Sequence, residues 1–557
     1  MRKTAPLLVL WLAVLELHAS SEPRRFAHGA VVSQHALASE VGAAVLKEGG
    51  NAVDAAVATA FALAVVHPAA GNLGGGGFLI YRPPTGESVA YDFREKAPAK
   101  AHPEMFLSGG TYDEKKHHES ALAVGVPGSV AGLHRAWKEQ GKLPWRRLVE
   151  PAVKLARDGF VVSDALARSL AKVLPDMKPF PESVAQFTRA GTPYQAGDRL
   201  KQPELARSLE RIARDGLAGF YKGETARLLV KQLARLGGIV TLEDLASYRA
   251  ERRVPVHGTY RGYEVISMPP PSSGGTALVE MLNVLEGYDL QALGFGSADA
   301  LHLGAEAMRR AFADRARHLG DPEENPALPI ARLTSKEYAS ELRSTIRKER
   351  ASASSPESFE WPKESSETTH LSVVDKARGA VALTTTLEDS YGVKMVVKGA
   401  GFLLNNEMGD FNAGPGLTDT KGLIGTPPNL ARPGRRMLSS MTPAILAKDG
   451  KLALVTGSPG GRTIINTVLM TVLDTVDFGM NAQEAVDAPR FHHQWLPDQL
   501  QVERAGFSPD TLRILEQRGH QITTERVQGI AQVIGVVDGV LEAGADRRDA
   551  DSGAAGH

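Results

Sequence analysis

Apolar and polar positions along the first part of the chain predict two helices followed by two strands. Residues 39–46 and 52–66 are rich in Ala, Val and Leu, and a Gly-Gly-Asn stop and restart at 49–51 separates the two predicted helices. Apolar runs at 78–81 and 89–94 predict the strands. A run of glycines lies between the second helix and the first strand, so the chain turns sharply there.

The middle of the chain has a helical pattern, and a polar segment separates it from further strands. Residues 145–250 contain several amphipathic stretches and are mostly helical in pattern. Residues 347–366 are rich in Ser, Glu and Pro and predict an exposed, mobile loop. Strand-like runs follow directly at 369–375 and 380–387. A flexible segment that meets the first residue of a buried strand is a place where an internal proteolytic cut is tolerated.

The first 20 residues have the three-part pattern of a secretory signal peptide. Arg2 and Lys3 form the positively charged N-terminal region, and residues 5–14 form the apolar region. The segment 18–21, with its small residues, is the expected cleavage region. The apolar run is too short for a permanent membrane span. The alternative is a buried N-terminal helix. The signal-peptide interpretation predicts a mature protein that starts near Ser21 and is secreted, to the periplasm or the extracellular space.

Composition excludes several kinds of chemistry. Lys and Arg together number 64, as do Asp and Glu, so no net charge favours nucleic acid as a partner. The absence of cysteine excludes disulfides, thiol nucleophiles and cysteine-bound zinc. Residues 74–77 are glycines but lack the Lys-Ser/Thr of a phosphate-binding loop. His492 and His493 are adjacent, so they face opposite sides of a strand and are expected to be structural. We therefore expect no metal and no organic cofactor.

A set of short motifs, all in one order, carries a family resemblance. Each motif alone is weak, but together they extend over essentially the whole chain after residue 20. The chain resembles the γ-glutamyltransferases, which are N-terminal-nucleophile hydrolases. The motifs are ETTHLSVVD at 367–375, LNNEMGDF at 404–411, LSSMTP at 438–443, TGSPGG at 456–461, APRFHHQW at 488–495, NLGGGGF at 72–78 and DFRE at 92–95.

The resemblance implies an α/β fold, a four-layer αββα sandwich with helices outside two stacked antiparallel sheets. It also implies that one precursor is cut before Thr368. The products would be a large subunit, residues 21–367, and a small subunit, residues 368–557, which interlock in one domain.

Thr368 is the candidate nucleophile. A threonine hydroxyl is a weak nucleophile and needs an adjacent base. If the chain is cut before Thr368, the freed α-amine, with an ordinary pKa of roughly 7.7–8.0, lies beside its own hydroxyl and can accept the proton. Before the cut, the same hydroxyl could attack the Glu367 carbonyl. Read alone, Thr368 would be an ordinary strand threonine, and the motifs reverse that preference.

The resemblance assigns roles to further residues. Thr386 corresponds to the threonine that hydrogen-bonds the nucleophile, and Gly460-Gly461 to the oxyanion hole, although alone these glycines would be a plain turn. The α-carboxylate of a γ-glutamyl group would meet Arg94, Ser439 and Ser440, and its α-ammonium would meet Glu388, Glu407 and Asp410. Read singly, Arg94 could be a surface ion pair with Glu95, and the acids a solvated face.

Two positions differ from other members of the family. Some members carry asparagine where this chain has Glu388. Residues 412–433 resemble a loop that covers the pocket, where an aromatic residue often closes it, and this chain has Lys421 at about that place.

The expected reaction is a two-step γ-glutamyl transfer through an ester on Thr368. The donor would be glutathione or another γ-glutamyl compound, and the acceptor water, an amino acid or a dipeptide. Two alternatives remain open at this stage. One is an acylase for glutaryl-type β-lactam side chains, against which the retention of Glu407 and Asp410 argues. The other is an uncleaved, inactive homologue that serves as a binding protein.

Overall fold

The computed structural model describes residues 21–323, 325–354, 368–417 and 427–557. Three sequence predictions lie wholly or largely outside these ranges. They are the signal segment at residues 1–20, most of the loop at 347–366 and the covering position Lys421.

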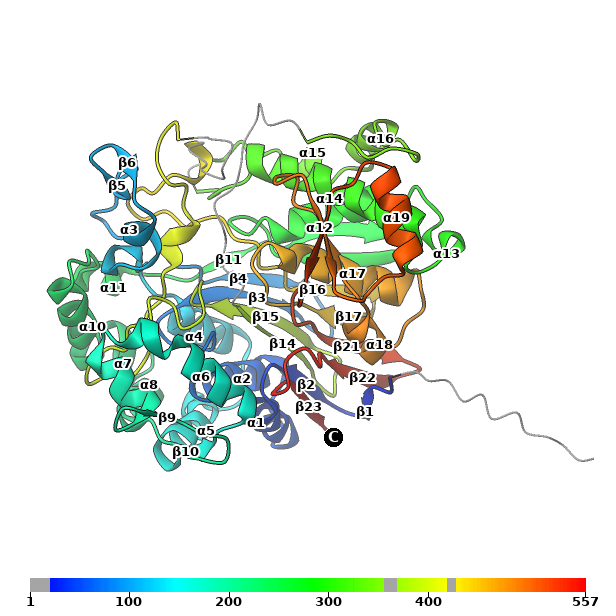
Figure 1. Ribbon diagram of the computed structural model, residues 1–557. Coiled ribbons are helices and arrows are strands. Elements are labelled where there is room, and N and C mark those ends of the chain that lie inside the picture. The colour runs from blue at the N-terminus through cyan, green and yellow to red at the C-terminus, as the bar shows by residue number, and fades with distance from the viewer. Residues whose placement is uncertain (1–20, 324, 355–367, 418–426) are drawn as a thin grey trace, which may run out of the picture.

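Two seven-stranded antiparallel sheets form the centre of the molecule (Figure 1). The first sheet has the order β11 (Glu251–Arg253), β4 (Val89–Asp92), β3 (Gly76–Arg82), β15 (Ala380–Thr386), β14 (Thr369–Val374), β2 (Ala30–Ser33) and β23 (Gly553–Gly556). The second has the order β1 (Arg24–Phe26), β22 (Val540–Ala545), β21 (Gln532–Val537), β17 (Lys451–Thr456), β16 (Ala444–Lys448), β13 (Tyr263–Ser267) and β12 (Val256–Tyr260).

Strands from before and after residue 368 alternate within both sheets. In the first sheet, β14 and β15 lie between β2 and β3, which come from the first hundred residues. In the second sheet, β22, β21, β17 and β16 lie between β1 and β13. The two parts of the chain therefore share their hydrogen-bonded ladders, and neither part has a complete sheet of its own.

Alternating side chains of the first sheet face two different cores. Phe78 and Ile80 of β3 belong to the core that also contains the second sheet, whereas Leu79 and Tyr81 pack into the core beneath the outer helices. This alternation follows from the two-residue period of a strand. Because both faces are covered by apolar side chains, each buried aliphatic residue contributes about 1.5–3 kcal/mol to folding.

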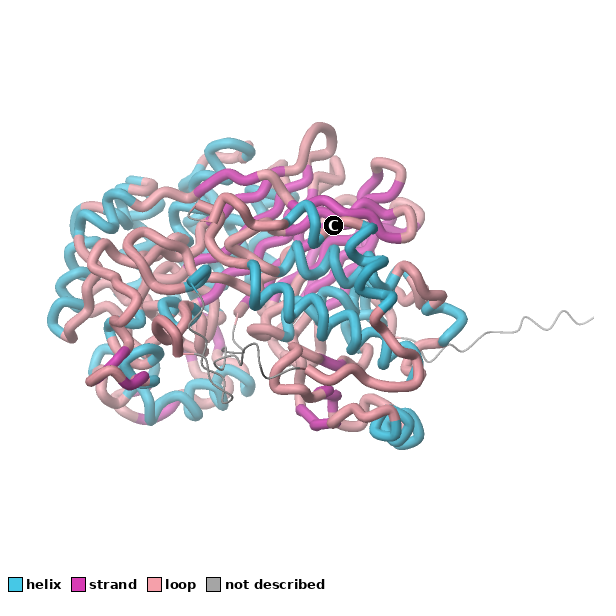
Figure 2. Tube along the Cα trace, turned by 90° about the horizontal axis from the view of Figure 1, so that it is seen from above, coloured by secondary structure: helices cyan, strands magenta, loops and turns pink. Residues whose placement is uncertain are grey.

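Helices form the two outer layers, so the fold is the predicted four-layer αββα sandwich (Figures 1 and 2). In Figure 2 helices lie over the strands. The layer on the first sheet includes α1 (Ala36–Lys47), α2 (Ala52–Val66), α4 (Ser129–Gln140), α5 (Trp145–Asp158), α6 (Asp164–Met177), α8 (Pro203–Asp215) and α10 (Gly223–Arg235). The layer on the second sheet includes α12 (Gly274–Leu285), α14 (Ala298–His318), α17 (Thr463–Val476) and α18 (Ala482–Asp487).

The helix α2 shows how local sequence sets these elements. Asn51 and Asp54 form a capping box at its N-terminus, which satisfies backbone N–H groups that the helix leaves unpaired. Every residue of α2 is buried, because α1 and α5 pack on it and its own sequence is apolar all round. The bounds predicted for this helix, 52–66, are confirmed.

Other predicted bounds differ by a few residues. The strand predicted at 89–94 ends at Asp92, whose carboxylate accepts a hydrogen bond from the Arg94 backbone N–H at 3.0 Å. The helix predicted at 39–46 starts at Ala36, where the His35 ring accepts a hydrogen bond from the Leu37 backbone. Within the described ranges, no helix is both long and apolar enough to cross a bilayer.

Candidate active site

Thr368 directly precedes the central strand β14, and the sheet sets its neighbour. Because Thr369 pairs with Thr385 in the antiparallel ladder, Thr368 lies opposite Thr386. The Thr368 hydroxyl donates a hydrogen bond to the Thr386 hydroxyl, with 3.4 Å between the two oxygens. The Glu388 backbone N–H donates to the same Thr386 oxygen at 2.9 Å. Both threonines are almost fully buried, so the strand pairing holds the two hydroxyls together away from bulk water.

The glycine-rich segment packs against Thr386 rather than forming a phosphate cradle. A Cβ at Gly75 would lie 2.1 Å from the Thr386 carbonyl oxygen, so only glycine permits this approach. The Asn72 side chain donates to the Thr386 carbonyl at 2.8 Å and accepts from the Gly75 backbone N–H at 3.0 Å. Ser129 donates to the same Asn72 oxygen at 2.6 Å. The segment therefore fixes the end of β15 beside Thr368.

Arg94 is the centre of a buried ionic cluster. Its side chain is 1% exposed, and its guanidinium donates to the carboxylates of Glu407 and Asp410. It also donates to the Leu438 carbonyl at 3.0 Å. The alternative of a surface ion pair with Glu95 is wrong in its main point, because Arg94 is buried and Glu95 lies farther away, at 4.0 Å.

Acidic groups outnumber the cations Arg94 and Lys394 around this cluster. Burial raises the pKa of Glu407 although Arg94 acts in the opposite direction. Burial also raises the pKa of Glu388, and the nearby Asp389, Asp410 and Glu407 add to the rise. Burial raises the pKa of Glu95 to about 8. A cationic group that entered the cavity would relieve this excess of carboxylates.

Glu388 has an unusual backbone conformation for a residue that is not glycine. Its φ is 76°, in the left-handed region. One carboxylate oxygen lies 3.4 Å from Nδ1 of His118, a residue that sequence analysis did not single out. His118 follows a run of polar residues, and that run looks like an exposed loop in the sequence. Nothing there indicates that His118 contacts the site.

Gly460 and Gly461 form a tight turn before helix α17. Their φ values are 133° and 56°, both positive. The backbone N–H groups of Thr463 and Ile464 donate back to the carbonyls of these two glycines at 3.1 Å. Gly461 lines the cavity, whereas its neighbour Gly460 does not. The positive end of α17 therefore points toward the cavity.

Ser439 and Ser440 are held by an arginine that sequence analysis did not find. Arg315 of α14 donates to the Ser440 hydroxyl at 2.8 Å and to the Ser273 hydroxyl at 2.7 Å. Ser273 in turn donates to the Ser439 carbonyl at 2.6 Å. In the sequence, Arg315 can be noticed only as a charged residue within a buried helical pattern. That pattern does not indicate which residues Arg315 contacts.

One cavity brings the predicted residues together. It has about 280 Å³ of space, including the part open to solvent. Of the residues predicted for the site, only Gly460 does not line it, although its neighbour Gly461 does. The predicted site residues on its wall are Arg94, Thr368, Thr386, Glu388, Glu407, Asp410, Ser439, Ser440 and Gly461, and Met441 and Ile464 complete it.

Known structures share this architecture. The fold aligns with a cephalosporin acylase from Bacillus halodurans with a TM-score of 0.85 at 27% identity, covering 99% of each chain. It also aligns with the γ-glutamyltranspeptidase of Helicobacter pylori at 48% identity and a TM-score of 0.56, covering 57% of this chain and 91% of that one.

Sequence comparison identifies the family. The gamma-glutamyltranspeptidase family profile matches residues 38–556. The glutathione hydrolase proenzyme of Escherichia coli K12 is 50% identical over 544 residues, which cover 96% of this chain and 93% of the relative. That of Pseudomonas sp. A14 is 46% identical, covering 91% and 89%. The chain belongs to the γ-glutamyltranspeptidase family, and the predicted resemblance is confirmed.

Proposed function

We propose that this protein transfers the γ-glutamyl group of glutathione and related compounds to water, amino acids or dipeptides, with Thr368 as nucleophile. The observation that carries the proposal is that the Thr368 hydroxyl shares one cavity with Arg94 and the acids around it. The cavity therefore offers a nucleophile beside a site of mixed charge, which matches a substrate whose α-ammonium and α-carboxylate lie a few bonds away from the γ-carbonyl that is attacked.

Maturation would begin at the same hydroxyl. The Thr368 Oγ1 attacks the Glu367 carbonyl, the bond from that carbonyl to the Thr368 nitrogen breaks, and the nitrogen takes up the proton. Water then hydrolyses the ester, which leaves a carboxylate on Glu367 and a free α-amine on Thr368. The products are the large subunit, 21–367, and the small subunit, 368–557. The shared ladders between strands of both parts would keep them associated.

The freed α-amine then serves as the base. Thr368 Oγ1 attacks the γ-carbonyl of the donor, and its proton passes to the α-amine. Negative charge develops on the carbonyl oxygen, where backbone N–H groups at Gly460-Gly461 and the positive end of α17 stabilise it. The leaving amine takes the proton, and a γ-glutamyl ester remains on Thr368. Water or an acceptor amine attacks this ester, returns a proton to Thr368 and releases the product.

Recognition of the donor divides between two sets of groups. Its α-carboxylate would bind Arg94 with Ser439 and Ser440, because the planar guanidinium matches a carboxylate with two parallel hydrogen bonds. Its α-ammonium would bind Glu388, Glu407 and Asp410. The carboxylates that contact Arg94 would then divide their charge between Arg94 and the ammonium, which offsets the cost of burying them.

The N-terminal segment completes the proposal. Residues 1–20 would export the chain, so that the enzyme matures and acts outside the cytoplasm. The balanced charge of the chain gives no attraction for nucleic acid. The chemistry described needs no metal or organic cofactor.

The decisive experiment replaces Thr368. Thr368→Ala should remain a single full-length band on a denaturing gel and should not release p-nitroaniline from γ-glutamyl-p-nitroanilide. Thr368→Ser keeps a hydroxyl and should still be cut, more slowly. If Thr368→Ala is cut at the same junction and turns over the substrate, the mechanism is wrong. An uncut wild-type chain without turnover would support the binding-protein alternative.

A second experiment distinguishes γ-glutamyl transfer from the acylase alternative. That alternative is considered because the fold resembles a cephalosporin acylase from Bacillus halodurans. Glutaryl-p-nitroanilide differs from γ-glutamyl-p-nitroanilide only in lacking the α-ammonium. We expect a preference of at least tenfold in kcat/KM for the γ-glutamyl compound, and Asp410→Asn should reduce it. A preference for the glutaryl compound would favour the acylase.

A further inference from the structure

A second cavity lies at the far end of α17 from the catalytic cavity. It opens between α14, the C-terminal part of α17 and the segment that leads into β18 (Phe491–His492), and its space is about 450 Å³, including the part open to solvent. Ile464 of α17 lines the first cavity and Asp474 lines the second, ten residues along the helix, or about 15 Å. The two cavities share no lining residue.

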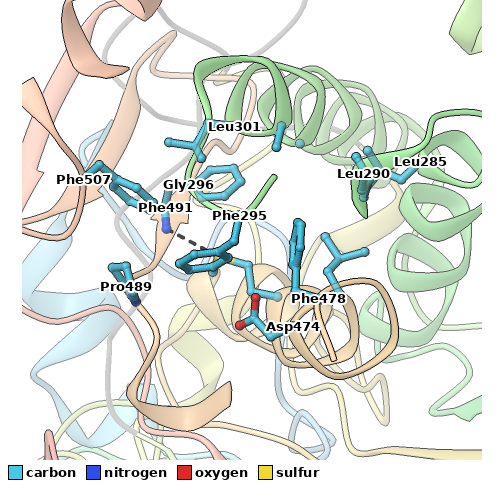
Figure 3. Close-up of a pocket in the computed structure, with 14 residues that line it drawn as sticks. Leu285, Leu290, Phe295, Gly296, Leu301, Asp474, Phe478, Pro489, Phe491 and Phe507 are labelled. Atoms are coloured by element: carbon cyan, nitrogen blue, oxygen red, sulfur yellow. Dashed lines mark hydrogen bonds between the residues drawn. The ribbon is translucent and has the colours of Figure 1, made fainter. Parts of the chain in front are cut away.

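Aromatic rings form much of its wall (Figure 3). Phe295 and Phe478 meet edge to face with 5.4 Å between ring centres, and Phe491 and Phe507 do so at 6.1 Å. Gly304 of α14 makes room for one of them, since a Cβ there would lie 2.7 Å from Cζ of Phe491. Phe295 is 42% exposed, so its ring is accessible from solvent.

One carboxyl group, that of Asp474, lies in this apolar surrounding (Figure 3). Its residue is 5% exposed, and within the described ranges no group donates a hydrogen bond to the carboxylate. Burial raises its pKa and Asp477 adds to the rise, whereas Arg490 and Arg548 act in the opposite direction. The Arg490 side chain donates its own hydrogen bond to Asp546, at 2.7 Å. Asp474 also sits in the last turn of α17, where the helix dipole disfavours a negative charge. Burial and the helix dipole therefore both disfavour a charge on this carboxyl group.

We propose that this cavity is a binding site for a small alkylammonium ion. The ammonium would contact the Asp474 carboxylate and the faces of the surrounding phenylalanines, and the alkyl chain would fill the apolar remainder. Aromatic rings attract cations through their electron-rich faces, most strongly where water is excluded. A single carboxylate among apolar walls offers too few oxygen ligands for a metal ion, so an organic cation fits the chemistry better.

The test is calorimetric titration of the cleaved wild-type protein with n-pentylammonium chloride and, in parallel, with 1-pentanol. The ammonium should bind at least tenfold more tightly than the alcohol. Asp474→Asn, which keeps the shape but removes the charge, should weaken ammonium binding at least tenfold. Ala300→Trp, at a half-buried position that lines the cavity, should fill part of it and block both ligands. This second variant keeps the test valid if Asp474→Asn does not fold.

Two controls locate the binding. Asp510→Asn removes a carboxylate that is 79% exposed on α19 (Pro509–Gln517) and should leave the affinity unchanged. The acids of the first cavity could themselves attract an ammonium, so Asp410→Asn serves as the second control. Because the proposed site lies in the other cavity, this variant should leave the binding unchanged. Loss of binding in Asp410→Asn alone, equal affinity for the alcohol, or no binding to the wild type would overturn the proposal.

Discussion

The Asn72 side chain and the Thr386 carbonyl, 314 residues apart in the chain, are joined by a hydrogen bond of 2.8 Å. Asn72 does not itself line the catalytic cavity, and it contacts the cavity residue Thr386 through that residue's carbonyl at the end of β15. A buried hydrogen bond of this kind contributes about 1 kcal/mol, and its unpaired partner costs about 1–3 kcal/mol. Its effect on chemistry would come from displacing Thr386.

Replacement of Asn72 should therefore lower kcat more than it changes KM. We expect Asn72→Ala to reduce kcat for γ-glutamyl-p-nitroanilide by about 10- to 100-fold, because small displacements of reacting groups are costly. Asn481→Ala is a matched control, since Asn481 caps α18 away from the site. Both variants should lose thermal stability, but only the first should lose turnover. Equal kcat values in the two cleaved variants would refute the positioning role.

Arg94→Lys tests the recognition of the donor carboxylate. Lysine keeps the charge but cannot form two parallel hydrogen bonds, so KM for the donor should rise about 10- to 100-fold, with a smaller change in kcat. Steady-state kinetics on the cleaved enzyme measure this split. Arg135→Lys, at a partly buried position of α4 that pairs with Glu139 and does not line the cavity, should behave like the wild type. An unchanged KM would show that Arg94 pairs only with its own acids and does not bind substrate.

Local pattern and motif predicted the elements and most of the site. The apolar composition of residues 52–66 and the strand-like runs at 369–375 and 380–387 were sufficient to locate α2, β14 and β15. The motifs named Thr368 and Arg94, which the fold then brings to one cavity.

Long-range contacts could not be predicted in the same way. A sequence specifies residue types but no distances, so the motifs predict a substrate carboxylate as the partner of Arg94 and do not predict its contacts with Glu407 and Asp410. Arg315 lies 125 residues from Ser440 and belongs to no motif. Only the packing of α14 against the site reveals that contact.

Arg315 should act as a positioning residue for Ser440. Arg315→Lys keeps a cation but cannot reach both Ser273 and Ser440, so we expect KM for the donor to rise about 3- to 30-fold with kcat nearly constant. Arg309→Lys is a matched control, because Arg309 is a buried arginine of the same helix that bonds to Ser354 and Asp498. Both variants should be less stable. If both raise KM equally, the effect is structural and the positioning role is refuted.

Glu388 should make folding less favourable as pH rises. Burial raises its pKa above the unfolded value, so the unfolded chain loses this proton first, and stability falls from about pH 4.3 upward until the folded group also ionises. Glu388→Gln removes this pH-dependent loss of folding stability. The variant should unfold at a higher temperature than the wild type at pH 7, and the difference should vanish near pH 4, as thermal unfolding of the cleaved protein will measure.

Glu306 should change folding stability with pH in the opposite direction to Glu388. Burial opposes its ionisation, but a Ser352 hydrogen bond and two arginines outweigh that and lower its pKa to about 2. Its contribution, about 3 kcal/mol at most, is present above pH 4.5 and is lost as pH falls toward 2. Glu306→Gln should therefore lower the unfolding temperature at pH 7 and approach the wild type in acid. If Glu388→Gln shifts in the same direction as Glu306→Gln at pH 7, the Glu388 carboxylate is stabilised by its surroundings, and the excess of negative charge inferred for the cavity is wrong.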